Sequence, residues 1–317
     1  MQGWDFEKPI IELKQKIEEL RSFSTDEKVE MSSEISNLET KLKSLKKEIY
    51  SNLTPWQKVQ ISRHPRRPTT LDYLKSIADD YILLSGDRSF GEDHALICGF
   101  ATIEGKKIAF AGHQKGKDTH ENIKRNFGCA HPEGYRKAMR IMKLAERFKL
   151  PIVCFIDTPG AYPGIGAEER GQAQAIAENI RDMFSIKTPI IVMVVGEGGS
   201  GGALGIGVGD RVLICQYGYY SVISPEGCAA ILWKDAAKRE EAARVLKLTA
   251  PELIELKIVD EIIPESEGGA HWNPDESAAS LKKSLLENIS QVEGLSPQQL
   301  LEKRYQRFRK IGKFIEK

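Results

Sequence analysis

Two glycine-rich segments hold the residues best suited to chemistry in this sequence, Asp157 to Gly164 and Gly196 to Gly202. Each follows a short, β-branched apolar run, at Ile152 to Ile156 and at Ile190 to Val195, and such runs are typical of buried strands. Glycines directly after a strand let backbone N–H groups converge on a ligand atom, because no Cβ blocks the approach. Both segments therefore predict sites that stabilise negative charge.

Three kinds of site use such glycines, and the first is a dinucleotide site. Gly196, Gly198 and Gly201 fit the G-x-G-x-x-G fingerprint after a strand. That fingerprint needs an acidic residue at the end of the next strand to hold the ribose, and Gln216 stands there instead. Nicotinamide binding is therefore disfavoured. No G-x-x-x-x-G-K-[ST] string occurs, which excludes a Walker loop.

The second kind of site is that of a serine hydrolase. Ser200 lies at the centre of Gly198 to Gly202, which satisfies the G-x-S-x-G pattern of a nucleophile elbow. His271 lies downstream and would have to come within hydrogen-bond reach of Ser200 to act as its base. A hydrolase that uses Ser200 is the alternative function.

The third kind of site stabilises an oxyanion, such as the enolate of a thioester. Backbone N–H groups aimed at the developing charge contribute about 3 kcal/mol per donor. From the residues alone, the two glycine segments predict two oxyanion sites in one chain. The simpler alternative is that they only close the turns between strands and helices.

The composition indicates a cytoplasmic protein. The 317 residues include 46 basic and 45 acidic side chains, and the net charge of +1 favours neither nucleic acid nor a membrane as a partner. No stretch of about 18 apolar residues occurs. The five cysteines are scattered without a C-x-x-C pair, so they predict reduced thiols in the core and no metal site in this chain.

The elements that position the glycine segments begin with an N-terminal helical hairpin. Apolar residues spaced by three and four run from Ile10 to Leu20 and from Ile35 to Ile49. The polar segment Arg21 to Lys28 between them predicts a turn. We expect this hairpin to serve docking or dimerisation. Prolines within Arg63 to Pro68 mark its boundary with the next part of the chain.

The rest of the pattern alternates strands with helices. Such alternation predicts parallel βαβ layers and an α/β fold. Helices are also expected after Ser224 and, continuously, beyond Thr249. The other expected elements are a helix over Thr70 to Leu83, a β-hairpin of Ala95 to Ile103 and Lys107 to Ala111, helices over Glu133 to Lys149 and Glu168 to Phe184, and strands over Arg211 to Cys215 and Tyr220 to Ile223.

Several strings in a fixed order add a family resemblance. They are Gly-His-Gln-Lys-Gly at 112, Asn-Phe-Gly at 126, Pro-Glu-Gly-Tyr-Arg-Lys-Ala at 132, the two glycine segments, and Tyr-Ser-Val-Ile-Ser-Pro-Glu-Gly-Cys-Ala at 220. With them the chain resembles the α subunits of bacterial and plastid acetyl-CoA carboxylase carboxyltransferase over nearly its whole length. The resemblance implies a crotonase-like ββα superhelix at residues 63–294, after the helical hairpin or docking arm at 1–62 and before a helical C-terminal tail at 295–317.

The resemblance also implies a reaction and partners. This family transfers the carboxyl group of carboxybiotin, held on a biotin carboxyl carrier protein, to acetyl-CoA, and forms malonyl-CoA in the first committed step of fatty acid synthesis. The α subunit is expected to be active only with a zinc-ribbon β subunit, two of each per complex, and to work beside biotin carboxylase. Ala138 to Ile141 lacks the lysine of the Ala-Met-Lys-Met string of biotin carriers, so the biotin is expected on another protein.

The site residues that the resemblance implies lie in the same two segments and near them. The amides of Gly202 and Ala203 would form an oxyanion hole for the ureido oxygen of biotin, and Gly201 would allow the approach. The oxyanion hole for the thioester is then expected in the β subunit. Each chain is therefore expected to have one oxyanion hole, and not the two that the glycine segments alone predict. Lys115 and Arg170 would supply positive charge, unless each forms a salt bridge instead. The residues expected to bind substrate are Gly160, Ala161, Tyr162, Pro163, Gly164, Lys115 and Arg170.

Overall fold

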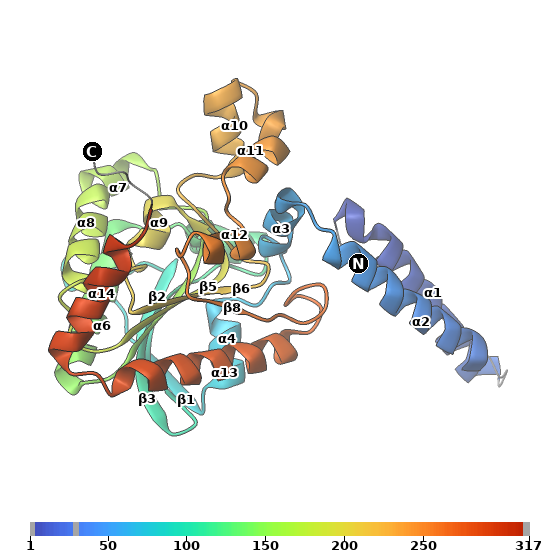
Figure 1. Ribbon diagram of the computed structural model, residues 1–317, viewed down its shortest axis with the longest axis horizontal. Helices are drawn as coiled ribbons and strands as arrows, with labels where there is room; N and C mark the ends of the chain where they lie inside the picture. The colour runs from blue at the N-terminus through green and yellow to red at the C-terminus, as the bar shows by residue number, and fades with distance from the viewer. Residues whose placement is uncertain (1–3, 28–31, 313–317) are drawn as a thin grey trace.

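A mixed β-sheet forms the centre of the structure, a computed structural model that describes residues 4–27 and 32–312 (Figure 1). The strand order is β1-β2-β3-β4-β5-β6-β8, and β7 pairs with β5. The first three strands are antiparallel and the others are parallel. The strands are β1 (Asp80–Leu83), β2 (Leu96–Ile103), β3 (Lys106–His113), β4 (Ile152–Thr158), β5 (Ile190–Gly199), β6 (Arg211–Cys215), β7 (Tyr219–Ser221) and β8 (Glu261–Ile263). The predicted α/β class is confirmed.

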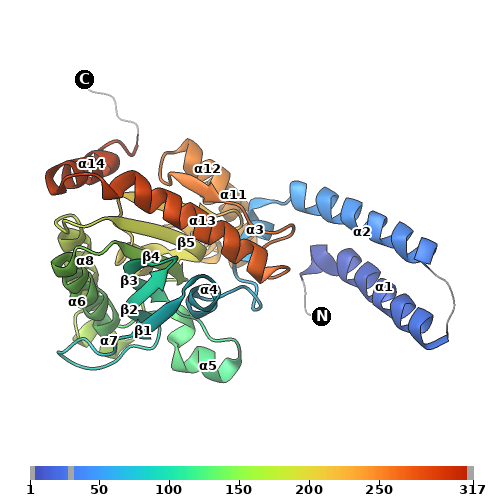
Figure 2. The same ribbon diagram turned by 90° about the horizontal axis from the view of Figure 1, so that it is seen from below.

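Helices cover both faces of the sheet, as both Figure 1 and Figure 2 show. On one face, α6 (Pro132–Phe148) and α8 (Gln172–Met183) pack on side chains such as Cys154 and Val192. On the other, α4 (Thr70–Ile77) and α13 (Pro274–Glu293) pack on Phe155 and Met193. Because neighbouring residues of a strand point to opposite faces, β4 and β5 are apolar at every position of their first halves.

The remaining helices connect these layers or project from them. They are α3 (Pro55–Ser62), α5 (Thr119–Lys124), α7 (Ile165–Glu169), α9 (Ser200–Leu204), α10 (Pro225–Trp233), α11 (Arg239–Val245), α12 (Ala250–Glu255) and α14 (Pro297–Arg309). In Figure 1, α10 and α11 stand away from the sheet. In the part of the chain that the structure describes, no helix is long and apolar enough to cross a membrane.

The β-hairpin is confirmed, but the helix expected over Thr70 to Leu83 is too long. It ends at Ile77, and the next residue is extended, with ψ of 142°. The chain then forms β1, in which Asp80 pairs with Thr102 and Leu83 with Gly99. Pairing with β2 thus overrides the local helical pattern, which the sequence alone cannot reveal.

Two predicted elements differ near the glycine segments. The helix expected over Glu168 to Phe184 is divided into α7 and α8 at Gly171, whose φ of +80° is left-handed and breaks a helix. The strand expected over Ile190 to Val195 continues to Gly199, because Gly198 pairs with both Thr158 and a residue of β7. The second glycine segment is therefore half strand and half helix.

The C-terminal part was predicted to be helical beyond Thr249, and this is wrong at one place. The short strand β8 interrupts the helices and pairs in parallel with β6. The helical tail itself is confirmed as α14. Its Arg304 is fully buried, donates to the backbone oxygens of Met183 and Ile186, and pairs with Asp210 at 2.7 Å.

The N-terminal hairpin is confirmed for the described residues and extends away from the sheet in Figure 2. It comprises α1 (Lys8–Glu27) and α2 (Ser32–Ser51), after a short 3-10 turn at Asp5–Glu7. The turn predicted over Arg21 to Lys28 is wrong for residues 21–27, which continue α1, and Lys28 lies outside the described residues.

Candidate functional site

The two glycine segments lie side by side, because β4 and β5 are parallel neighbours and both segments start at their carboxyl ends. Their backbones are in direct contact. A Cβ on Gly199 would stand 2.1 Å from the carbonyl oxygen of Pro159, and a Cβ on Gly202 would stand 2.4 Å from Gly160 C and 2.6 Å from Ala161 N. Only glycine fits such close approach. The structure thus brings the predicted hole and its predicted wall together.

The predicted oxyanion donors lie at the start of the short helix α9. No side chain caps its first turn, so its leading N–H groups have no acceptor from a side chain. Ser200 is exposed, Gly201 is half-buried, Gly202 and Ala203 are buried, and Leu204 is exposed again. The amides of Gly202 and Ala203 therefore lie in the buried part of α9.

The wall residues are held by their own contacts. The ring of Tyr162 stacks on His131 with 4.1 Å between centroids, and a Cβ on Gly164 would stand 2.3 Å from the Tyr162 ring. The buried side chain of Gln172 donates to the backbone oxygens of Ala130 and Tyr162 at 2.8 and 2.9 Å. Tyr162 is therefore fixed rather than free to swing.

Lys115 lies at the other side of the strand ends, in an ion-pair network that the sequence did not predict. Its Nζ lies 2.8 Å from Asp157 Oδ1 and 2.6 Å from Glu197 Oε2. Glu197 Oε1 also accepts from Arg63 Nε at 2.6 Å and from the Tyr219 hydroxyl at 3.0 Å. Burial lowers the pKa of Lys115, but Asp157 and Glu197 outweigh it and hold that pKa above its usual value. The ammonium group therefore stays charged.

A cavity of about 280 Å³, lined mainly by charged and polar residues, adjoins this network at the carboxyl ends of β3, β4 and β5. Its lining includes Lys115, Arg63, Asp157, Glu197 and the exposed Phe127, whose φ of 54° is left-handed. The sequence did carry a signal for three of these residues, Lys115, Asp157 and Glu197, since charged side chains at the ends of buried strands gather at one sheet edge in an α/β fold.

Arg170 lies apart from Lys115, on the side of α6. Its guanidinium donates to both carboxylate oxygens of Glu133, at 2.9 and 3.2 Å, and lies over the exposed ring of Phe90 at 4.3 Å. The hydrogen bond that Arg170 donates to Glu133 raises the pKa of Arg170. Like Lys115, Arg170 already has a carboxylate partner within the chain.

His113 is a buried residue that the sequence did not single out. It is the last residue of β3 and fully buried, and the backbones of Phe155 and Gly202 lie beside its ring. Burial lowers its pKa to about 4. The imidazole is therefore neutral near pH 7.

Ser200 and His271 are not brought together. His271 is buried against the N-terminal arm, where its Nε2 lies 3.2 Å from Glu7 Oε1, and its other ring nitrogen has no hydrogen-bond partner among residues 4–27 and 32–312. Ser200 is exposed on α9 with a left-handed φ of 48°. The geometry that a serine hydrolase needs is absent from these two residues, so the structure contradicts the hydrolase alternative.

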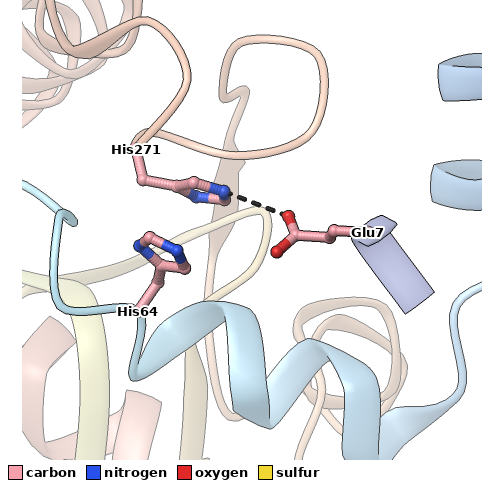
Figure 3. A group of neighbouring side chains, drawn as sticks. All are labelled: Glu7, His64 and His271. Carbon is pink, nitrogen blue, oxygen red and sulfur yellow. Dashed lines mark hydrogen bonds and ion pairs between the residues drawn. The ribbon is translucent and has the colours of Figure 1, made fainter. Parts of the chain in front are cut away.

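Glu7, His64 and His271 are buried together and offer ligand atoms within 4.8 Å of one another (Figure 3). The two imidazole rings stack at 4.0 Å with 19° between their planes. Nitrogen lone pairs lie in the ring plane, so stacked rings direct them side by side and not toward one ion. Glu7 also accepts hydrogen bonds from the Tyr50 hydroxyl at 2.7 Å and from Trp4 N at 2.9 Å. This group is a hydrogen-bonded clasp between the arm and the rest of the chain.

A family model described as acetyl co-enzyme A carboxylase carboxyltransferase-like matches residues 3–312. The chain is 54% identical over 310 residues to acetyl-coenzyme A carboxylase carboxyl transferase subunit alpha of Halalkalibacterium halodurans, which covers 98% of this chain and 95% of that protein. It is also 54% identical over 312 residues to the subunit of the same name from Thermus thermophilus, with 98% of this chain and 99% of that protein covered.

Solved structures support the fold. Transcarboxylase 12S aligns with a TM-score of 0.57 and 19% sequence identity, over 72% of this chain and 44% of that chain. At this identity the likeness concerns the fold alone. It confirms the predicted crotonase-like ββα superhelix.

Proposed function

Because the chain belongs to the acetyl-coenzyme A carboxylase carboxyltransferase family, as an α subunit that forms malonyl-CoA, we propose how its own residues contribute to that reaction. The carboxyl donor is carboxybiotin on a separate biotin carboxyl carrier protein, and the acceptor is acetyl-CoA. A zinc-ribbon β subunit, two per two α subunits, completes the active site, and biotin carboxylase supplies the carboxylated carrier. The enzyme works in the cytoplasm.

The observation that supports this proposal most directly is the backbone contact between the two glycine segments. Gly202 packs on Gly160 and Ala161 without room for a Cβ, next to the uncapped first turn of α9. Biotin supplies a ureido group whose oxygen becomes negatively charged when the carboxyl group leaves. Amide donors that are fixed before the reaction stabilise such charge with little reorganisation. The residues present therefore fit the ureido oxygen.

The remaining site residues have supporting parts in this proposal. Gly201 leaves the approach to the amides of Gly202 and Ala203 open, since a Cβ there would have only the side chain of Ile176 nearby, at 3.7 Å. The wall from Gly160 to Gly164 shapes the pocket, and Tyr162 and Pro163 form its side. Lys115 and Arg170 remain predicted contacts to anionic groups of the substrate. Such groups would have to compete with the carboxylates that each residue already binds.

The test is co-purification of the chain with a zinc-ribbon β subunit, followed by malonyl-CoA decarboxylation with free biotin. We expect activity from the mixture and none from either chain alone, because one oxyanion hole per chain cannot stabilise both anions of the reaction. Activity of the isolated chain would contradict this division. Lack of activity with a β subunit that co-elutes would contradict the proposed function.

A further inference from the structure

The ladder between β4 and β5 is interrupted immediately before the two glycine segments. Ile156 pairs with Val194 and Thr158 with Gly198, so Asp157 alone stands opposite three residues of β5. A parallel ladder holds strands together through evenly spaced backbone hydrogen bonds, and an irregularity of this kind removes some of them. The spacing of the strand ends must therefore be set here by other contacts.

The side chain of Asp157 makes these contacts. Its Oδ1 accepts a hydrogen bond from Glu197 N at 3.0 Å and one from Lys115 Nζ at 2.8 Å. The same Nζ donates to Glu197 Oε2 at 2.6 Å. Gly196 leaves space for the carboxylate, since a Cβ there would stand 2.4 Å from Asp157 Oδ1. One ammonium group thus joins the loop after β3 to both strand ends.

Glu197 is fixed from its other side as well. Its Oε1 accepts from Arg63 Nε at 2.6 Å and from the Tyr219 hydroxyl at 3.0 Å. Burial raises the pKa of Glu197, but Lys115 and Arg63 outweigh burial and lower that pKa to about 2. Without Lys115, two buried carboxylates would face each other with Arg63 as the remaining cation, and their repulsion would favour separation of the strand ends.

A displacement at this point would reach the proposed oxyanion hole. Asp157 precedes Gly160 by three residues, and Glu197 precedes Gly202 by five, and the two glycines are in contact. We infer that Lys115 is a positioning residue: by joining Asp157 to Glu197, it sets the distance between the Gly160–Gly164 wall and the amides of α9. This inference rests on the proposed function and assigns Lys115 a positioning part in place of its predicted contact with substrate.

The experiment compares three variants in the complex with the β subunit, assayed by malonyl-CoA decarboxylation with biotin. Lys115→Met should lower kcat about 10- to 100-fold and leave KM for malonyl-CoA within about twofold, because a misplacement near 1 Å costs about 10²-fold. Asp157→Asn should have a similar effect, and the double variant should be no worse than the more impaired single variant. As a matched control, Lys143→Met removes an exposed lysine–carboxylate pair, to Asp182 at 2.9 Å, and should retain the wild-type kcat.

A direct contact between Lys115 and substrate predicts different results. Asp157→Asn would then keep or increase activity, because it frees the ammonium group from a competing carboxylate, and Lys115→Met would raise KM for biotin. Either result overturns the inference. Thermal melting and co-elution with the β subunit report folding, and Asp157→Asn decides the question if Lys115→Met does not fold. An inactive wild-type complex would instead count against the proposed function.

Discussion

Replacement of Gly202 by alanine tests the oxyanion hole most directly. The new Cβ would stand 2.4 Å from Gly160 C, about 1 Å short of the 3.4 Å at which ordinary contact begins. Backbone lies on both sides of this contact, so either α9 or the wall must move by about that distance. Since a 1 Å misplacement costs about 10²-fold and loss of one oxyanion donor costs about 10²- to 10³-fold, we expect kcat to fall at least 100-fold.

The matched control for this variant is Gly294→Ala, after the end of α13 and outside the site. Its Cβ would meet nothing within 4 Å, so kcat should stay within about threefold of wild type. Overpacking at Gly202 costs about 1–3 kcal/mol of stability, which a folded chain tolerates. The assay is malonyl-CoA decarboxylation by the complex, with co-elution as the folding check. If Gly202→Ala retains a third of the wild-type kcat, or if Gly294→Ala loses as much activity as Gly202→Ala, the hole is not at these amides.

Three further predictions concern residues outside the hole. Ser200→Ala should keep kcat within a few fold, because His271 is not its partner; a loss of about 1,000-fold in the same assay would restore the hydrolase. Arg304→Met should lower the free energy of unfolding in urea by about 3–5 kcal/mol, since it leaves Asp210 buried without its cation; a loss below about 1 kcal/mol would contradict this. Burial raises the pKa of Glu7, but its hydrogen bonds outweigh burial and lower it from 4.5 to about 2. The ionised Glu7 therefore stabilises the fold above pH 4.5, and this contribution is lost as the pH falls toward 2. The stability difference between wild type and Glu7→Gln should shrink over that range in acid-unfolding curves, and a constant difference would speak against it.

The glycine segments and the strands before them could be predicted because their signals are local. A β-branched apolar run followed by a glycine-rich segment predicts β4 and β5 from the local sequence alone. The short strands β1 and β8 could not, since each is a strand only through pairing with a neighbour, Asp80 with Thr102 and Glu261 with Leu213. The length of β5 could not be predicted for the same reason. The sequence pattern places its end at Val195, whereas pairing with its neighbours extends the strand to Gly199.

Side-chain networks escaped prediction for a related reason. Arg63 and Glu197 are 134 residues apart in the chain, and no local sequence pattern around either residue indicates that the two form a pair. Lys115 was singled out for its charge, but only the fold reveals that this charge is balanced by Asp157 and Glu197. Sequence patterns thus predicted where the chemistry takes place, and the fold was needed to show which charges remain available there.

The clasp of Glu7, His64 and His271 has a consequence for biosynthesis. Its hydrogen bond from His271 to Glu7 spans 264 positions of the chain, the first of which leaves the ribosome long before the last is translated. Domains fold largely in the order in which they emerge. Glu7 therefore waits without its His271 partner until nearly the whole polypeptide has been made. Closure of the clasp is thus one of the last events of maturation, and a chain that stops before residue 271 lacks this hydrogen bond.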